Sequence, residues 1–185
     1  MRVVHVAKMG TLEQFLAEYD PSQANAVDGN GRSVLLAALG NTDPAARVAI
    51  TNRVLDDGAD AAVVSPSGAN ALHVLLARAK PENPGETVLL QRLLDGGADA
   101  NAVMPKFGTP LQTLMDRFEL SDEQLAPFYD VVFSRPDLDL LKVGAYRLST
   151  LDAARKARRL RAGLVERMEA YLRDHGAAPV SCRPG

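Results

Sequence analysis

Histidine and cysteine are the side chains of this chain best suited to catalytic or metal chemistry. His73 stands in "NALHVLL", whereas His5 and His175 lie near opposite ends, without the spacing of a zinc-binding helix. The single cysteine, Cys182, has no histidine nearby to activate it as a nucleophile. No set of residues combines a nucleophile, a base and an oxyanion donor. We therefore expect neither an enzyme nor a metal or cofactor site.

Three polar motifs remain. "DGNG", residues 28–31, lacks the acidic series of a calcium loop and the G-K-[ST] of a phosphate loop, so we predict a tight turn. The acid pair Asp56–Asp57 flanks a predicted helix end and has no companion base. "RKARRLR", residues 155–161, carries five positive charges on a predicted helix. It is either a site for nucleic acid, anionic lipid or an acidic protein, or a solvated terminal face; the lack of interleaved aromatic residues favours the second interpretation.

Composition narrows the class of protein. The 185 residues are 46% hydrophobic and 24% charged, as expected for one globular domain. The formal net charge is −2, but residues 151–185 carry eight Lys/Arg against four Asp/Glu, so the remaining chain is acidic. An acidic bulk makes nucleic-acid binding improbable. No apolar run approaches the ~18 residues of a membrane span, and the first residues lack a signal-peptide pattern, so we expect a cytoplasmic protein.

The elements that would position these residues recur along the chain. "VLDDGADAAV" and "LLDGGADANA" both end an apolar segment with glycine, and Gly58 and Gly97 are 39 residues apart. Ten residues beyond Asp60 and Asp99 stand Asn70 and Thr109. These two residues can cap a helix, and the same register contains Ser33 and Ser149, with a leucine two positions after each cap. Recurrence at this period is typical of repeat proteins, in which each unit packs on its neighbours.

The apolar periodicity predicts five pairs of helices. We expect them near residues 3–9 and 11–19, 33–40 and 45–57, 70–80 and 85–95, 109–118 and 122–134, and 149–162 and 163–175. They form one domain, residues 1–178, in units of approximately 1–26, 27–62, 63–102, 103–142 and 143–178. We expect residues 179–185 to be a flexible tail.

The strings "NALHVLL", "GTPLQTL", "SVLLAA" and "STLDAA" resemble the T-P-L-H-x-A signature of the ankyrin-repeat family. The resemblance covers roughly residues 3–178 and implies an all-α solenoid of about five helix-turn-helix units, capped by the first and last. It gives His73 a structural role within its own repeat. The units are longer than the usual 33 residues, and the fourth lacks the glycine stop, which leaves its register open by about one residue.

The resemblance also implies a non-enzymatic protein-binding module, monomeric by itself, that uses its finger tips and the exposed face of each first helix. The residues at these positions are Asn30, Arg32, Pro66, Ser67, Val74, Ala77, Arg78, Lys106, Phe107, Thr113, Asp116, Arg117, Tyr146, Arg147 and Lys156. Small proteins of this type resemble immunity proteins that neutralise a toxin, and the acidic bulk would suit a basic toxin. The alternative is a scaffold or accessory subunit that stabilises or assembles an enzyme complex.

Overall fold

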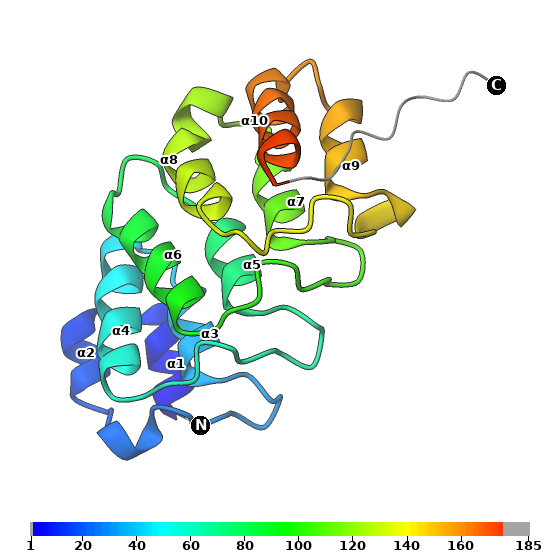
Figure 1. Cartoon of the computed structure of the whole chain (residues 1–185). Coiled ribbons are helices and arrows are strands. Elements are labelled where there is room, and N and C mark those ends of the chain that lie inside the picture. Colours follow the sequence, from blue (N-terminus) through cyan, green and yellow to red (C-terminus); the bar gives the residue numbers. More distant parts are fainter. Residues whose placement is uncertain (1, 176–185) are drawn as a thin grey trace, which may run out of the picture.

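The computed structural model describes residues 2–175, and within this range the chain is all-α (Figure 1). Ten α-helices and two short 3-10 helices occur, together with four isolated β-bridges. The helices are α1 (Arg2–Met9), α2 (Leu12–Leu16), η1 (Pro21–Gln23), α3 (Val34–Leu39), α4 (Pro44–Asp56), α5 (Ala71–Leu76), α6 (Gly85–Asp95), α7 (Pro110–Met115), α8 (Asp122–Phe133), η2 (Ala145–Arg147), α9 (Thr150–Lys156) and α10 (Ala162–Asp174). The tail expected at 179–185 lies outside the described residues.

The helices form two stacked layers. The odd-numbered helices pack in the order α1, α3, α5, α7, α9, and the even-numbered helices pack in the order α2, α4, α6, α8, α10. The loops that lead from each even-numbered helix to the next odd-numbered helix project to one side of the stack (Figure 1). We call these loops, residues 17–33, 57–70, 96–109 and 134–149, the finger loops.

Local hydrogen bonds explain where the odd-numbered helices after α1 begin. Ser33, Asn70, Thr109 and Ser149 each stand in extended conformation before a helix, and each side chain accepts a bond from the amide three residues ahead. The four predicted caps are therefore confirmed. The leucine two residues after each cap is buried, and this places one leucine of each of these four units in the shared core.

The recurring glycines end the even-numbered helices as expected. Gly58 follows α4 with φ of 86° and Gly97 follows α6 with φ of 97°, a conformation that glycine adopts at little cost. The chain then turns through residues 60–62 and 99–101, where the carboxylates of Asp60 and Asp99 each accept a bond from the amide two residues ahead.

The fourth unit keeps this geometry without the glycine. Asn101 donates to the Asp137 carbonyl at 2.7 Å and accepts from the Asp139 amide at 2.8 Å. Asn25 binds Gly58 and Asp60 in the same way, two finger loops earlier in the stack. Asp139 is therefore the equivalent of Asp60, and the register left open by the sequence is resolved.

The predicted helix ends are less accurate than the helix starts. The helix expected at 11–19 ends at Leu16, and the one expected at 149–162 ends at Lys156. Helices α5 and α7 are likewise shorter than predicted. Part of the reason is that side chains from other parts of the stack bind carbonyls near helix ends. Asn41, for example, donates to the carbonyl of Ala7 in the last turn of α1 and to that of Gly10 directly after it.

Candidate protein-binding face

The finger loops, the odd-numbered helices and the turns after these helices line three hollows. The exposed face expected on each first helix is absent from α3 and α7, because every residue of these two helices is buried and the exposed positions lie in the turns that follow. Each finger loop is narrowed near its tip by one β-bridge: Val27 with Ser33, Val64 with Asn70, Met104 with Gly108, and Val143 with Ser149. Because the next helix begins one or two residues after each bridge, the fingers are held close to the helices. We call this surface the finger face.

The first hollow lies between the first two fingers and helices α3 and α5. It has a volume of about 390 Å³ and includes Lys8, Asn30, Arg32, Pro66, Ser67, Val74 and Arg78. Asp28 accepts bonds from the amides of Asn30 and Arg32, and the Arg32 amide is the main cause that lowers the pKa of this carboxyl. The "DGNG" motif is thus a tight turn at a finger tip, as predicted.

The second hollow, of about 210 Å³, is the most apolar of the three. It is lined by Ala69, His73, Val74, Ala77, Arg78, Met104, Phe107 and Thr113. Phe107 is 51% exposed and follows Lys106, whose φ of 73° marks a sharp turn at the third finger tip. The hollow therefore joins an exposed aromatic ring to a cation, Arg78, for which no ion-pair partner occurs among the described residues.

His73 has a structural role in this hollow. Its Nδ1 lies 2.7 Å from Asn70 Oδ1 and its Nε2 lies 2.9 Å from the Gly108 carbonyl of the next finger. Burial is the main cause that lowers the pKa of His73, although the bond to Gly108 opposes the shift. The histidine joins two units, whereas the sequence suggested bonds within one repeat.

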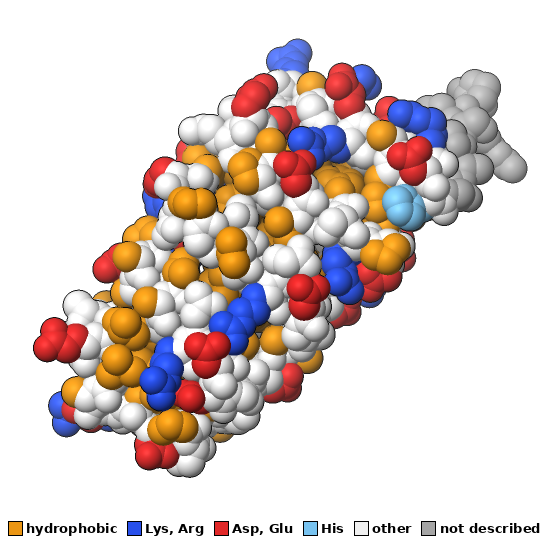
Figure 2. Space-filling model, turned by 60° about the vertical axis from the view of Figure 1, so that its left-hand side comes forward, with side chains coloured by type: hydrophobic (Ala, Val, Ile, Leu, Met, Phe, Trp, Pro, Cys, Tyr) orange, Lys and Arg blue, Asp and Glu red, His pale blue; other side chains and the backbone are white. Residues whose placement is uncertain are grey.

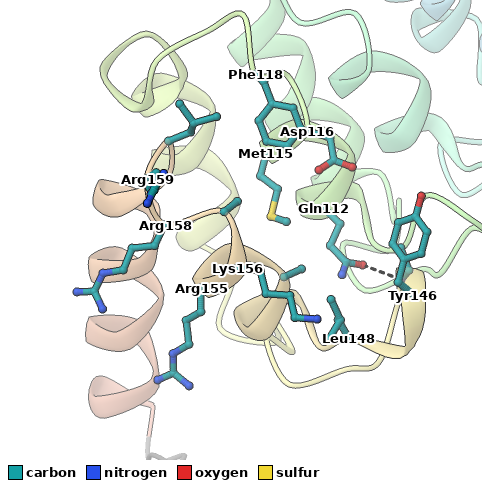
Figure 3. Close-up of a pocket in the computed structure, with 14 residues that line it drawn as sticks. Gln112, Met115, Asp116, Phe118, Tyr146, Leu148, Arg155, Lys156, Arg158 and Arg159 are labelled. Carbon is teal, nitrogen blue, oxygen red and sulfur yellow. Dashed lines mark hydrogen bonds between the residues drawn. The ribbon is translucent and has the colours of Figure 1, made fainter.

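The third hollow is the largest, about 620 Å³, and lies between α7, the fourth finger and α9 (Figure 3). Met115, Asp116 and Phe118 come from α7 and the turn after it, while Lys156 belongs to α9 (Figure 3). Because α9 ends at Lys156, the chain turns and brings Arg158, Arg159 and Leu160 to the same hollow. The arrangement differs from the sequence-based expectation of one helix that continues to residue 162.

The fourth finger ends in an exposed tyrosine. Tyr146 is 85% exposed, and both Tyr146 and Arg147 have positive φ, 54° and 59°. Non-glycine residues adopt this conformation uncommonly, so the turn that presents them is strongly specified. Both residues are at the finger tip, where the sequence placed them.

Two residues expected at the contact surface instead donate hydrogen bonds to backbone carbonyls of the fold. Thr113 is only 9% exposed, and its hydroxyl donates to the Thr109 carbonyl one helical turn back. The Arg117 side chain is 16% exposed, and its Nη1 donates to the carbonyls of Ala77 and Ala79 at 3.1 Å each. The expectation that these two side chains face solvent is wrong, because the first satisfies its own helix and the second links α7 to the end of α5.

Some cations of the basic segment 155–161 also bond within the fold, whereas others lie at the surface without an ion-pair partner. Arg161 is fully buried and donates to the carbonyls of Met115, Arg117 and Leu120 after α7. Arg155 pairs with Glu169 of α10 at 3.0 Å. Lys156, Arg158 and Arg159 have no ion-pair partner in residues 2–175 and line the third hollow.

Other classes of site are not apparent in the part of the chain that the structure describes. No three His, Cys, Asp or Glu side chains of residues 2–175 are grouped so that they could hold a metal ion. Over the same residues, each helix is too short or too polar to cross a membrane.

Comparison with known proteins shows a similarity in fold. No protein-family model matches the chain, and no curated protein matches it. The chain is similar to a crystal structure of a functionally unknown protein from Leptotrichia buccalis C-1013-b, with 22% sequence identity and a TM-score of 0.70. The match covers 94% of this chain and 94% of the other. At this identity the similarity concerns the fold and carries no statement about function.

Proposed function

We propose that this protein is a non-enzymatic module that binds another protein through the finger face. The observation that carries the proposal is that twelve of the fifteen residues selected from the sequence line the three hollows of this face. The hollows combine exposed apolar side chains with cations, and aromatic and arginine side chains are the commonest anchors of protein interfaces. A face built on stacked helices loses little entropy on binding.

The fold supports assignment to the ankyrin-repeat family. The supporting features are two layers of antiparallel helix pairs, finger loops that project to one side, and a polar cap at the same place in four units. The units are longer than the family's usual repeat, and the additional residues lie in the connection between the two helices of a pair and in the second helix. This assignment is part of the proposal.

Charge distinguishes the finger face from the opposite side. Charges on the even-numbered helices are paired along the stack, Arg92 with Asp56 at 2.6 Å and Arg167 with Asp130. Arg135, two residues after α8, pairs with Asp95 of α6 at 3.4 Å. Figure 2 views this side and shows positive and negative side chains next to one another, with hydrophobic side chains between them. The fifteen residues selected from the sequence include one carboxylate and six cations. Arg32 pairs with Asp28 and Arg117 with Glu119, and the other four cations make no ion pair within residues 2–175: Arg78, Lys106, Arg147 and Lys156. The face therefore favours an acidic partner surface, unlike the basic toxin that the net charge of the chain suggested.

Two biological roles fit such a module. In the first, it is an immunity protein that neutralises a toxin whose contact surface is acidic. In the second, it is a scaffold or accessory subunit that stabilises or assembles an enzyme complex. In both roles we expect a cytoplasmic protein that is monomeric until its partner binds. A toxin-like reading frame next to the gene would favour the first role, and genes for a multisubunit enzyme would favour the second.

The experiment is capture of the partner from the organism that encodes the chain. A variant with Arg78→Glu and Phe107→Ser removes the cation and the ring of the second hollow. The matched control carries Arg173→Glu and Val88→Ser, which change one exposed cation and one exposed apolar side chain on even-numbered helices. We expect the first variant to lose the partner and the control to retain it. Equal capture by the two variants would refute the finger face as the binding surface.

A further inference from the structure

The third hollow, which we call the terminal groove, has a floor and rim of different chemistry. Six of its fourteen lining residues have non-aromatic apolar side chains: Met115, Ala145, Leu148, Ala153, Ala157 and Leu160. Leu160 is 56% exposed, although leucine usually lies in a core. Two aromatic rings, Phe118 and Tyr146, stand at separate places around it (Figure 3). An occupant with an apolar side chain would cover this surface.

The rim carries positive charge that the fold leaves without a partner. Lys156, Arg158 and Arg159 line the groove and make no ion pair with residues 2–175. The one carboxylate in the lining is Asp116, and burial raises its pKa. Salt bridges elsewhere in the molecule neutralise neighbouring arginines, so three adjacent exposed cations indicate an anionic occupant.

The buried side-chain amide of Gln112 is a second, independent indication of an occupant. Gln112 is 2% exposed, and its Oε1 accepts bonds from the amides of Thr109 at 2.9 Å and Ala145 at 3.3 Å. These two donors fix the orientation of the amide group, and Nε2 is left without a hydrogen-bond partner among the described residues. In Figure 3 this nitrogen points toward the part of the groove where Leu148 and Lys156 lie. An unpaired buried donor is costly, and a carbonyl or carboxylate oxygen would satisfy it.

The surroundings of Gln112 hold it in this position. A Cβ atom at Gly108 would lie 1.8 Å from Gln112 Oε1, and one at Gly144 would lie 2.0 Å from the same atom. Only glycine leaves room for the amide between the third and fourth fingers. The donor is thus a built feature of the groove and not a side chain free to turn away.

We propose that the terminal groove binds an acidic peptide segment of a partner protein, with apolar side chains on the floor and carboxylates at Lys156, Arg158 and Arg159. Backbone or carboxylate oxygen accepts a hydrogen bond from Gln112 Nε2 after a small opening of the floor. The inference rests on the proposed function in that the occupant belongs to a protein. A single nucleic-acid strand fits less well, because the floor is aliphatic and the two rings do not form a stacking platform for successive bases.

The probe is a fluorescent, end-capped peptide of four Glu-Leu pairs, titrated with the whole chain. Comparison peptides contain four Glu-Ser pairs or four Lys-Leu pairs, and an eight-residue oligothymidylate represents nucleic acid. We expect measurable binding of the Glu-Leu peptide, and binding weaker by at least about tenfold for each comparison ligand. Binding should also weaken with salt, because the rim charges are exposed.

The groove variant carries Lys156→Glu, Arg158→Glu and Arg159→Glu. Its control, Lys80→Glu with Lys142→Glu and Arg173→Glu, has the same net charge but changes cations outside the groove. We expect the groove variant to weaken Glu-Leu peptide binding by about tenfold or more and the control to weaken it less than about twofold. Leu160→Ser should weaken it several-fold, and circular dichroism should show that all variants remain folded.

Four results would overturn the proposal. They are absence of binding up to about millimolar peptide, equal loss in the groove variant and its control, equal binding of the Glu-Ser peptide, and preference for the oligothymidylate. Self-association of the chain that the groove variant abolishes would assign the groove to a second copy instead. If the peptide fails while Arg78→Glu with Phe107→Ser still abolishes partner capture, the groove proposal fails and the proposed function stands.

Discussion

Arg47 of α4 and Glu86 of α6 form an ion pair inside the stack, with side chains that are 1% and 0% exposed. Arg47 Nε lies 3.0 Å from Glu86 Oε1, and the other guanidinium nitrogens donate to the carbonyls of Asn41 and Arg78. Glu86 also accepts from the Lys80 amide at 2.8 Å. The pair therefore holds the ends of α3 and α5 together, and Arg117 and Arg161 do the same for later helices.

We expect Glu86→Ala to lower the free energy of unfolding by about 3–5 kcal/mol, because it leaves a buried guanidinium without its counter-charge. Urea denaturation measures the change. A double variant, Arg47→Leu with Glu86→Leu, should recover part of the loss since it removes both charges. The exposed pair of Arg2 and Glu18 is the control, and Arg2→Ala should cost less than about 1 kcal/mol. Equal losses in the buried and exposed pairs would contradict this interpretation.

We expect the contacts of Arg161 to stabilise mainly the last unit. Arg161→Lys keeps the charge but cannot reach three carbonyls after α7 with a planar fork, so we expect it to cost roughly 2–3 kcal/mol. Because the contacts join α10 to α7, amide exchange in α10 should become faster. Arg159→Lys, two residues away and exposed, is the control and should leave exchange unchanged.

The caps predict a further effect on stability. Thr109→Ala removes the acceptor for the Gln112 amide and the hydroxyl that lies 3.0 Å from Thr150 Oγ1. We expect a loss of roughly 1–2 kcal/mol in thermal or urea denaturation. Thr42→Ala, at an exposed threonine outside the helices, is the matched control and should change little. Indistinguishable melting temperatures would show that the cap contributes nothing.

His73 predicts a dependence of stability on pH. Burial lowers its pKa in the folded state, so the unfolded chain takes up the proton first as the pH falls. The contribution of neutral His73 is therefore complete above about pH 6.5 and is lost as the pH drops below that value. We expect up to about 1.4 kcal/mol less stability at about pH 5.5 than at neutral pH from this group. His73→Gln should flatten the dependence; an unchanged slope would mean that another group is responsible.

The start of each helix could be predicted because its cause lies within three residues of the cap. Ser33 and Ser149 act on amides directly ahead of them in the sequence, and the glycine stops after α4 and α6 act equally locally. The helix ends could not be predicted as well. Asn41 and Arg161 bind carbonyls more than thirty residues away, and a charged residue on a helix usually faces solvent.

The sequence predicted which residues lie at the finger tips. Asn30, Phe107 and Tyr146 stand at the tips because the caps fix the length of each finger loop. The net charge of the whole chain does not describe this face, where Arg78, Lys106, Arg147 and Lys156 make no ion pair within residues 2–175. Gln112 was missed as a donor, although "TPLQ" places a glutamine three residues after a cap, where its oxygen closes a capping box and its nitrogen is left free.

The central claim is that the finger face is the binding surface, and hydrogen exchange of the chain with and without its captured partner tests it most directly. We expect protection of amides in the finger loops, at residues 64–70, 104–108 and 143–149, and in the exposed turns that follow α5 and α7. Helices α4, α6 and α8 should exchange as in the free chain. Protection confined to those even-numbered helices, with unchanged exchange in the fingers, would contradict the account.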